Sequence, residues 1–380
     1  GVIQYGTGTK TIGIWGHLDV VPEGTGWLYP PFSCSREGDI LIGRGVQDNK
    51  GPVVACMYAM GYLKEKGMVP RVTFLQILGC REEVDMEDVV SYLNENPAPD
   101  MSFVTDCAFP VCYGEKGICR VEFASEKLEG NMILSGGNAV NSIPAYAKAE
   151  LRLLGGRKKE IWAEGISGHA AFPQGAQNAL GMLAEKIYSE DKNLSVLSEK
   201  ERAVLEFLDK ACADGFGREL NIDCADEFSG ALTASGTVVR MEEERAVLDM
   251  DIRYPITAKA EKILEQLGRT AGEYGFSIRS FKDDPPSYVD KNTPFVTCLT
   301  NAYEEIVKDG KKPYVMGGGT YARKIPNAVG FGPGLQSDWE KAGLPKGHGS
   351  CHSADEAQSL SSLKTAVRIY VKALQNLNEL

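Results

Sequence analysis

The chain has 380 residues, of which 43% are hydrophobic and 24% charged, and its formal net charge is −11. This composition is typical of a globular protein with two domains, and no apolar run reaches the roughly 20 residues that span a bilayer. The acidic balance argues against nucleic acid as a partner, because binding to phosphates needs a basic surface. The ten cysteines include no C-x-x-C pair, so we expect free thiols in a reducing compartment, the cytoplasm.

The first third of the chain alternates strand and helix patterns. Strands are predicted at 11–15, 71–78 and 101–105, and helices are predicted at 50–66 and 86–94. A β-α-β-α-β order predicts an α/β fold with a mostly parallel sheet that is covered by helices on both faces.

The middle third mixes strands and helices without this alternation, which is typical of an α+β domain. Strand patterns lie at 118–123, 146–153, 159–163, 236–241 and 245–252, and helical patterns lie at 174–188, 197–213 and 258–274. From about residue 292 the α/β pattern returns, with a helix to 307, short strands near 314 and 329, and a helix from about 360. We therefore predict a discontinuous α/β domain over 1–117 and 290–380, with an α+β domain inserted over 118–289.

Two of the four histidines and several carboxylates lie at the ends of predicted strands or in turns. They are His17, with Asp19 two residues on, Asp48, the pair Glu82 and Glu83, Asp106 and His352. Taken singly, each has an ordinary structural explanation, such as helix capping for Asp48. Because the carboxyl ends of parallel strands form the ligand-binding edge of such a sheet, we expect these side chains to converge. Two histidines with several carboxylates suit Zn²⁺, or Mn²⁺ as the next candidate, and five ligands suit two metals that share a bridging carboxylate.

A longer series of motifs runs in order from about Gly13 to the C-terminus. It consists of H-L-D-V-V-P, G-W-x-Y-P-P-F, G-R-G-x-x-D-x-K-G-P, E-E, a strand-end aspartate, G-G-G-T-Y-A-R and H-x-A-D-E. This series resembles the M20 metallopeptidase family, and within it the carnosinase-like bacterial dipeptidases of the PepV type. The resemblance implies that the discontinuous domain is catalytic and that the inserted domain is a lid that binds substrate.

The resemblance also implies a set of metal ligands. His17 and Asp106 would hold one zinc ion, Glu83 and His352 would hold the other, and Asp48 would bridge the two. The expected cofactor is therefore two Zn²⁺ ions, with Mn²⁺ or Co²⁺ as alternatives.

Other positions match the family's catalytic and substrate-binding residues. Asp19 would orient His17, and Glu82 would act as the general base that takes a proton from water and returns it to the leaving amine. His169 would donate to the oxyanion from the lid. The expected substrate contacts are Asn141, Arg253, Gly318, Gly319 and Thr320, the last four as donors to a terminal carboxylate. His348 matches no family position and is interpreted as a loop residue.

Three functions stay open on these residues. The first is hydrolysis of dipeptides, with a small peptide as the substrate. The second is hydrolysis of N-acyl or N-succinyl amino acids, which would use the same metal ligands with a different lid pocket. The third is metal binding without turnover, against which Glu82 argues because a binding protein needs no proton shuttle. We expect no nucleic-acid or membrane partner, and a monomer is favoured over a homodimer.

Overall fold

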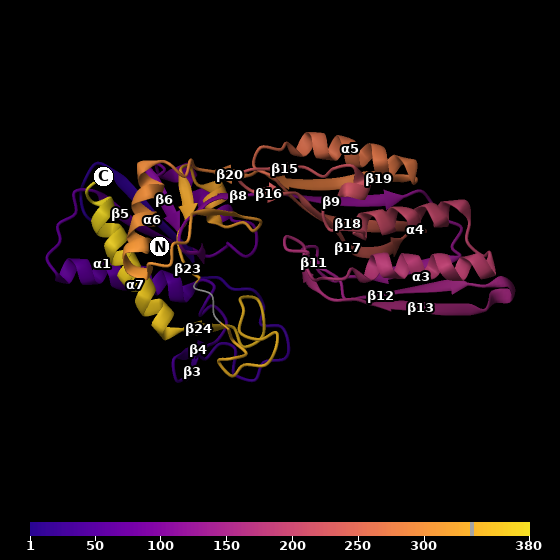
Figure 1. Cartoon of the computed structure of the whole chain (residues 1–380), viewed down its shortest axis with the longest axis horizontal. Helices are drawn as coiled ribbons and strands as arrows, with labels where there is room; N and C mark the ends of the chain where they lie inside the picture. The colour runs from indigo at the N-terminus through magenta and orange to yellow at the C-terminus, as the bar shows by residue number, and fades with distance from the viewer. Residues whose placement is uncertain (335–337) are drawn as a thin grey trace. The chain divides into compact units, whose positions relative to one another are not determined.

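The computed structural model describes residues 1–334 and 338–380 and divides the chain into two compact units. The first unit comprises Gly1–Glu115 and Ser287–Leu380, and the second comprises Lys116–Pro286 (Figure 1). One unit is thus inserted into the chain of the other. Within the two described ranges, no helix is both long enough and apolar enough to cross a membrane.

An eight-stranded sheet forms the centre of the first unit. Its strands are β1 (Val2–Tyr5), β2 (Thr11–His17), β5 (Thr73–Gly79), β6 (Met101–Val104), β8 (Cys112–Glu115), β20 (Ser287–Tyr288), β21 (Tyr314–Met316) and β22 (Ala328–Gly330). The order is β1-β5-β2-β6-β22-β8-β20, with β21 also paired to β8. The central strands β5, β2, β6 and β22 run parallel, and antiparallel pairs lie toward both margins. The predicted mostly parallel sheet is confirmed.

Helices cover both faces of this sheet. They are α1 (Lys50–Glu65), α2 (Glu87–Glu95), α6 (Pro294–Val307) and α7 (Leu360–Leu377), with the 3-10 helix η3 (Tyr321–Lys324). Figure 1 shows three of them, α1, α6 and α7. On one face α7 packs between α1 and α6 over a buried aromatic cluster that includes Phe103, Phe331 and Tyr370. On the other face α2 and η3 pack around Trp15. Short strands complete the unit: β3 (Ser35–Glu37), β4 (Ile40–Ile42), β7 (Cys107–Ala108), β23 (Pro333–Gly334) and β24 (Ala357–Ser359).

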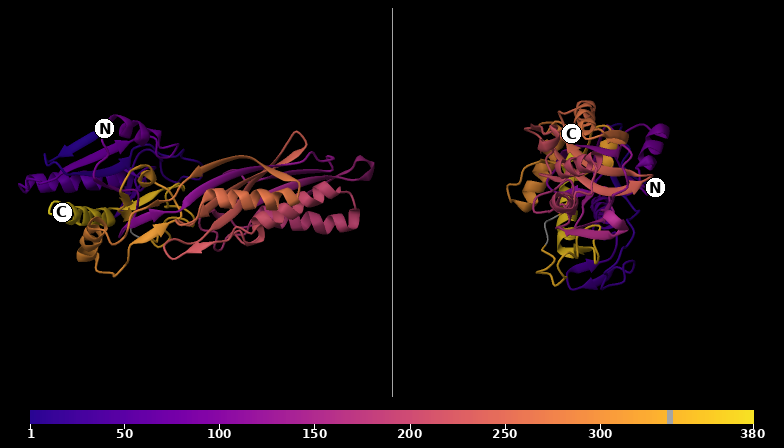
Figure 2. Two further views of the ribbon diagram at one scale, coloured as in Figure 1. Left: turned by 90° about the horizontal axis from the view of Figure 1, so that it is seen from above. Right: turned by 90° about the vertical axis from the view of Figure 1, so that its right-hand side faces the viewer.

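The second unit is a seven-stranded antiparallel sheet with helices on one face (Figure 2). In sheet order its strands are β13 (Lys158–Glu164), β12 (Tyr146–Arg152), β10 (Met132–Gly136), β17 (Thr233–Glu242), β18 (Arg245–Tyr254), β9 (Gly117–Ser125) and β19 (Phe276–Asp284). Its helices are α3 (Ala179–Leu194), α4 (Glu199–Cys212) and α5 (Ala260–Glu273), with η1 (Leu154–Gly156) and η2 (Arg218–Leu220). Two short pairs are β11 (Ser142–Ile143) with β14 (Gly168–His169) and β15 (Ala225–Asp226) with β16 (Gly230–Ala231).

The structure of the second unit differs from the sequence prediction at three elements, one helix and two strands. The helix predicted over 174–188 begins at Ala179, because the Asn178 side chain caps it by accepting a hydrogen bond from the Leu180 amide (3.0 Å). Strands β10 and β19 were not predicted. β10 is short, ends at Gly136 and is followed by a second glycine, Gly137. β19 has a register shift between Ile278 and Ser280 that interrupts its alternation.

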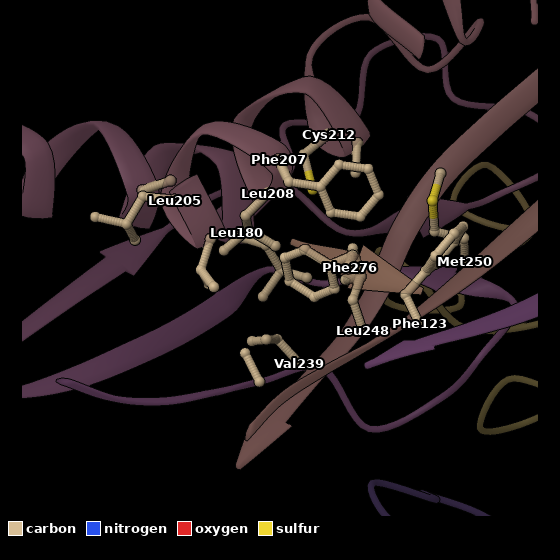
Figure 3. Close-up of a cluster of buried hydrophobic side chains, with 14 of the residues drawn as sticks. Phe123, Leu180, Leu205, Phe207, Leu208, Cys212, Val239, Leu248, Met250 and Phe276 are labelled. Carbon is tan, nitrogen blue, oxygen red and sulfur yellow. The ribbon is translucent and has the colours of Figure 1, made fainter. Parts of the chain in front are cut away.

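The core of the second unit lies between this sheet and its helices (Figure 3). Phe207 of α4 is fully buried, and its ring lies 5.3 Å from that of Phe123 and 4.6 Å from that of Phe276, centroid to centroid. The three rings come from a helix and two strands, so they join the two layers of the unit.

Phe207→Ala should lower the free energy of unfolding by about 3–5 kcal/mol, because it removes a buried ring and leaves a cavity. Denaturant unfolding followed by circular dichroism would measure the change. The control is Phe281→Ala, which truncates a phenylalanine of the same unit whose side chain is 58% exposed, and it should change stability by less than about 0.5 kcal/mol. Equal effects of the two substitutions would contradict this account of the core.

Candidate metal centre

Three parallel strands bring candidate ligands to one edge of the sheet in the first unit. β2 ends at His17, which pairs with Gly79 at the end of β5, and Trp15 of β2 pairs with Val104 at the end of β6. The segments that follow β5 and β6 carry Glu82, Glu83 and Asp106. The strand register therefore determines which carboxylates lie near His17.

Asp48 lies between the two histidines. Its Oδ1 is 2.9 Å from Nε2 of His17, and its Oδ2 is 3.1 Å from Nε2 of His352. Each carboxylate oxygen thus faces a different imidazole, which is the arrangement of a carboxylate that bridges two metal ions.

Each histidine also has a second carboxylate beside it. Asp106 Oδ2 lies 3.6 Å from His17 Nε2, and Glu83 Oε1 lies 3.2 Å from His352 Nε2. Three groups have ligand atoms that all lie within 4.8 Å of one another: His17, Asp48 and Asp106; His17, Glu82 and Glu83; and Asp48, Glu83 and His352. The first and third groups contain all five of the ligands that the sequence predicted.

Asp19 touches both halves of the centre. The Nδ1 atom of His17 lies 3.0 Å from the carbonyl oxygen of Asp19 and 3.4 Å from its Oδ1, so Nε2 is directed at Asp48. The other carboxylate oxygen, Oδ2, accepts a hydrogen bond from the Glu83 amide at 3.1 Å. A carbonyl or carboxylate partner of this kind fixes the tautomer and orientation of a ligating histidine.

The pKa values of the two histidines show that this group of side chains favours positive charge. Burial alone would lower the pKa of His17, but hydrogen bonds and charges of Asp106 and Asp48 outweigh it and raise that pKa to about 12. Hydrogen bonds with Asp48 and Glu83 raise the pKa of His352 to about 10. The surrounding carboxylates thus favour the protonated form of both imidazoles as long as no cation is bound.

The carboxylates themselves are also perturbed. Burial raises the pKa of Glu82 to about 9, the negative charge of Asp106 adds to this effect, and His17 offsets it in part. Burial, followed by the charge of Asp48, raises the pKa of Asp106 to about 6. Buried like charges at this spacing are unfavourable unless cations neutralise them. The donor set of imidazoles and carboxylates therefore fits two divalent cations of the zinc or manganese type.

Two residues that support the centre were not predicted. Asn49 is fully buried, and its side-chain amide donates to the Thr105 carbonyl (3.1 Å) and to Asp106 Oδ1 (3.4 Å). A Cβ atom on Gly16 would lie 2.8 Å from Asn49 Oδ1, which explains the glycine before His17. Glu356 is also fully buried and accepts a hydrogen bond from the Asp48 amide (3.0 Å). The sequence signal for Glu356 was its place in the H-x-A-D-E motif.

Thr320, a predicted substrate contact, has hydrogen-bond partners inside the first unit. Its amide and hydroxyl both donate to the buried carboxylate of Glu115, at 3.1 and 2.7 Å from Oε1, and Thr320 is itself buried. Arg323 pairs with the same carboxylate at 3.1 Å. These donors are engaged inside the first unit, and contact of Thr320 with substrate stays a prediction. For Gly318 and Gly319, contact with substrate stays a prediction.

Two predicted substrate residues of the second unit are neighbours. The Asn141 carbonyl accepts a hydrogen bond from the Ala170 amide (2.9 Å), next to His169 on β14. His169 Nδ1 accepts a hydrogen bond from the Ala171 amide (3.0 Å), so the neutral ring carries its proton on Nε2. That tautomer is the one that a donor to an oxyanion needs.

Arg253, the third predicted residue of this unit, lies on β18 and is buried. Its Nε and Nη2 atoms pair with both oxygens of Asp251, at 2.5 and 2.9 Å. The planar guanidinium thus makes a two-point contact with a carboxylate inside its own sheet. Its contact with substrate stays a prediction.

Comparison with known sequences identifies the family. A sequence profile of Peptidase family M20/M25/M40 matches residues 13–376. The Bacillus subtilis (strain 168) protein named "Putative dipeptidase YtjP" is 31% identical over 413 residues, which cover 99% of this chain and 85% of the relative. The Staphylococcus aureus (strain MW2) protein named "Putative dipeptidase MW1694" is 29% identical over 414 residues, with the same coverage.

Solved structures share the fold. Human carnosine dipeptidase 1 has a TM-score of 0.59 and 14% identity, and the match covers 100% of this chain and 82% of that one. Aminoacylhistidine dipeptidase from Vibrio alginolyticus has a TM-score of 0.58 and 17% identity, with 98% and 87% coverage. Given the profile match over nearly its whole length, this chain belongs to peptidase family M20/M25/M40 and is a metallopeptidase.

Proposed function

We propose that this protein is a dipeptidase that hydrolyses the amide bond of dipeptides at a centre of two zinc ions. The observation that carries the proposal is the Asp48 carboxylate, which offers one oxygen to the His17 side of the site and the other to the His352 side. The relatives that are 29–31% identical over almost the whole chain both bear the name dipeptidase. The structural neighbours named above are dipeptidases as well.

The five ligands divide into two sets around Asp48. His17 and Asp106 would hold one cation, and Glu83 and His352 would hold the other, with Asp48 common to both. Two bound cations supply Lewis-acid chemistry, since they polarise the scissile carbonyl and make water more acidic.

Glu82 is the residue best placed to move protons. Its carboxylate lies in one group with His17 and Glu83, and it has no place in either set of ligands around Asp48. Burial and neighbouring charges raise its pKa to about 9, and cations in the centre would lower that value toward the neutral range by offsetting those charges. A carboxylate with a pKa near the working pH accepts a proton from water and donates it to the leaving amine efficiently.

Three further predictions from the sequence belong to this proposal. Asn141, His169 and Arg253 of the second unit would bind and orient the peptide. The protein would act as a monomer on small peptides, and it would be located in the cytoplasm.

The zinc-loaded protein should hydrolyse dipeptides, β-Ala-His among them, and should leave a tripeptide, N-acetyl amino acids and N-succinyl amino acids intact. A chelator should abolish the activity and added Zn²⁺ should restore it, because the carbonyl then regains its electrophilic partners. Chromatographic assay of released amino acids would measure both. Turnover of acyl amino acids alone would assign a deacylase instead, and bound metal without any turnover would favour a metal-binding protein.

Glu82→Gln should lower kcat by about 10²–10⁴-fold, because the amide cannot accept the proton of water. Steady-state kinetics on the best dipeptide would show the loss, and calorimetry should show that both metal ions still bind. The matched control is Glu87→Gln, an exposed glutamate of the following helix, which should keep wild-type kcat. A fully active Glu82→Gln variant would exclude the glutamate as the base.

Metal binding should release protons, since His17 and His352 carry them at neutral pH with pKa values of about 12 and about 10. These raised pKa values mean that protons compete with metal at every pH below them, so the apparent metal affinity should rise as pH rises. Calorimetric titration in two buffers of different ionisation enthalpy would count the protons. Equal heats in both buffers would show that the histidines are neutral before metal binds.

A further inference from the structure

We propose that Glu356 is a positioning residue that holds the bridging carboxylate of Asp48 in place relative to His352. This inference rests on the proposed function, because it assigns Glu356 a task in a centre of two cations. Glu356 belongs to the H-x-A-D-E motif but is none of the five ligands, and its carboxylate is fully buried.

The carboxylate of Glu356 binds the turn that carries Asp48. Its Oε1 accepts hydrogen bonds from the amides of Gln47 (2.9 Å) and Asp48 (3.0 Å), and its Oε2 accepts one from the Gly45 amide (3.0 Å). Arg44 Nη1 completes the set at 2.7 Å from Oε2. Four donors satisfy one carboxylate, and three of them are consecutive or near-consecutive main-chain amides of a single turn.

The main chain of Glu356 is fixed to the same region from the other side. Its carbonyl accepts a hydrogen bond from the Gly43 amide (2.9 Å), and the next residue, Ala357, pairs with Ile42 in the strand pair β24–β4. Both the side chain and the backbone of Glu356 therefore fasten the residues that lead into Asp48. His352 lies four residues before Glu356 on the same short loop.

The loop between His352 and Glu356 has its own attachments. The Asp355 carboxylate is fully buried, and it accepts hydrogen bonds from the amides of Leu28 (2.9 Å) and Tyr29 (3.0 Å) while pairing with His348 Nδ1 at 2.6 Å. His352 and Asp355 both have positive φ angles, 63° and 50°, which non-glycine residues adopt only where contacts impose them. These contacts hold the loop in one conformation. Glu356 ends this loop and binds the amides of Gln47 and Asp48, so the position of the loop fixes the position of Asp48.

A simpler account treats Glu356 as the acidic half of a buried ion pair with Arg44. Both side chains are buried, and loss of one partner would leave an unpaired buried charge. The two accounts differ in what happens when both charges are removed together. The ion-pair account then predicts a normal protein. The positioning account predicts a disturbed centre, because glutamine keeps only one acceptor oxygen and turns an NH2 donor toward at least one of the three main-chain amides.

The test compares the wild-type protein with the double variant Arg44→Met/Glu356→Gln. Methionine keeps apolar contact with Trp27, over which the Arg44 guanidinium lies at 5.2 Å. The matched control is Asp191→Asn in the second unit. Asp191 is also a buried carboxylate that accepts from two amides, those of Val196 and Leu197, and from an arginine, Arg202.

Metal-free proteins would be titrated with Co²⁺, followed by calorimetry and by the visible absorption of the bound ion, and thermal unfolding would be recorded in chelator. We expect two Co²⁺ sites in the wild-type protein and in Asp191→Asn. In the double variant we expect a cooperative unfolding transition, one site of near-normal affinity and a second site about 10–100-fold weaker with an altered spectrum.

A folded double variant that binds both Co²⁺ ions with wild-type affinity and spectrum would overturn the proposal. Loss of the cooperative transition in the double variant, with Asp191→Asn still folded, would also overturn it, because Glu356 would then be needed by the fold as a whole. A wild-type protein without two Co²⁺ sites would reject the proposed function, and this result is distinct because it appears before any substitution is made.

Discussion

The shared carboxylate of Asp48 is the constraint on which the centre depends. A carboxylate can serve two imidazoles only if its two oxygens point in opposite directions within about 3 Å of each ring nitrogen, and the observed distances of 2.9 and 3.1 Å meet this demand. One histidine ends β2, and the other lies more than 300 residues later in the chain. Glu356 holds the turn that carries Asp48, and the next residue, Asn49, donates hydrogen bonds to Thr105 and Asp106.

The close spacing of carboxylates around the two histidines also shifts the pKa values in the centre. Asp48, Asp106 and Glu83 raise the pKa values of the two histidines, and burial together with the same three charges raises that of Glu82. Protons and cations therefore compete for the same site. Under the proposed function, this exchange would link metal binding to pH, and it would link the proposed base to the metals, because each bound cation would offset part of the field that raises the pKa of Glu82. A base outside this field would lack that dependence.

Much of the first unit could be predicted from sequence, because the position of a residue relative to its own strand determines on which edge of the sheet it lies. A histidine or carboxylate directly after a buried strand must lie at the carboxyl edge of a parallel sheet, which located His17, Glu83 and Asp106. Glu356 gives no such signal, since an acidic residue in a loop is usually solvated. In the second unit, β10 was not predicted, and its last residue is Gly136. A Cβ atom there would lie 2.6 Å from Leu180, so packing against α3 requires glycine within the strand.

Thr320 shows what sequence does not reveal, namely the partner to which a hydrogen-bond donor is directed. A glycine-rich motif ending in threonine indicates donors for an anion, and the structure does contain an anion for them, the internal carboxylate of Glu115. Sequence reveals the donors but not whether their acceptor is a ligand or a buried side chain of the protein. The same ambiguity applies to Arg253, whose guanidinium binds Asp251. Residue type therefore indicated the cluster of candidate metal ligands more fully than the substrate contacts, because several buried carboxylates with two histidines narrow the possible partners, whereas a single donor has many.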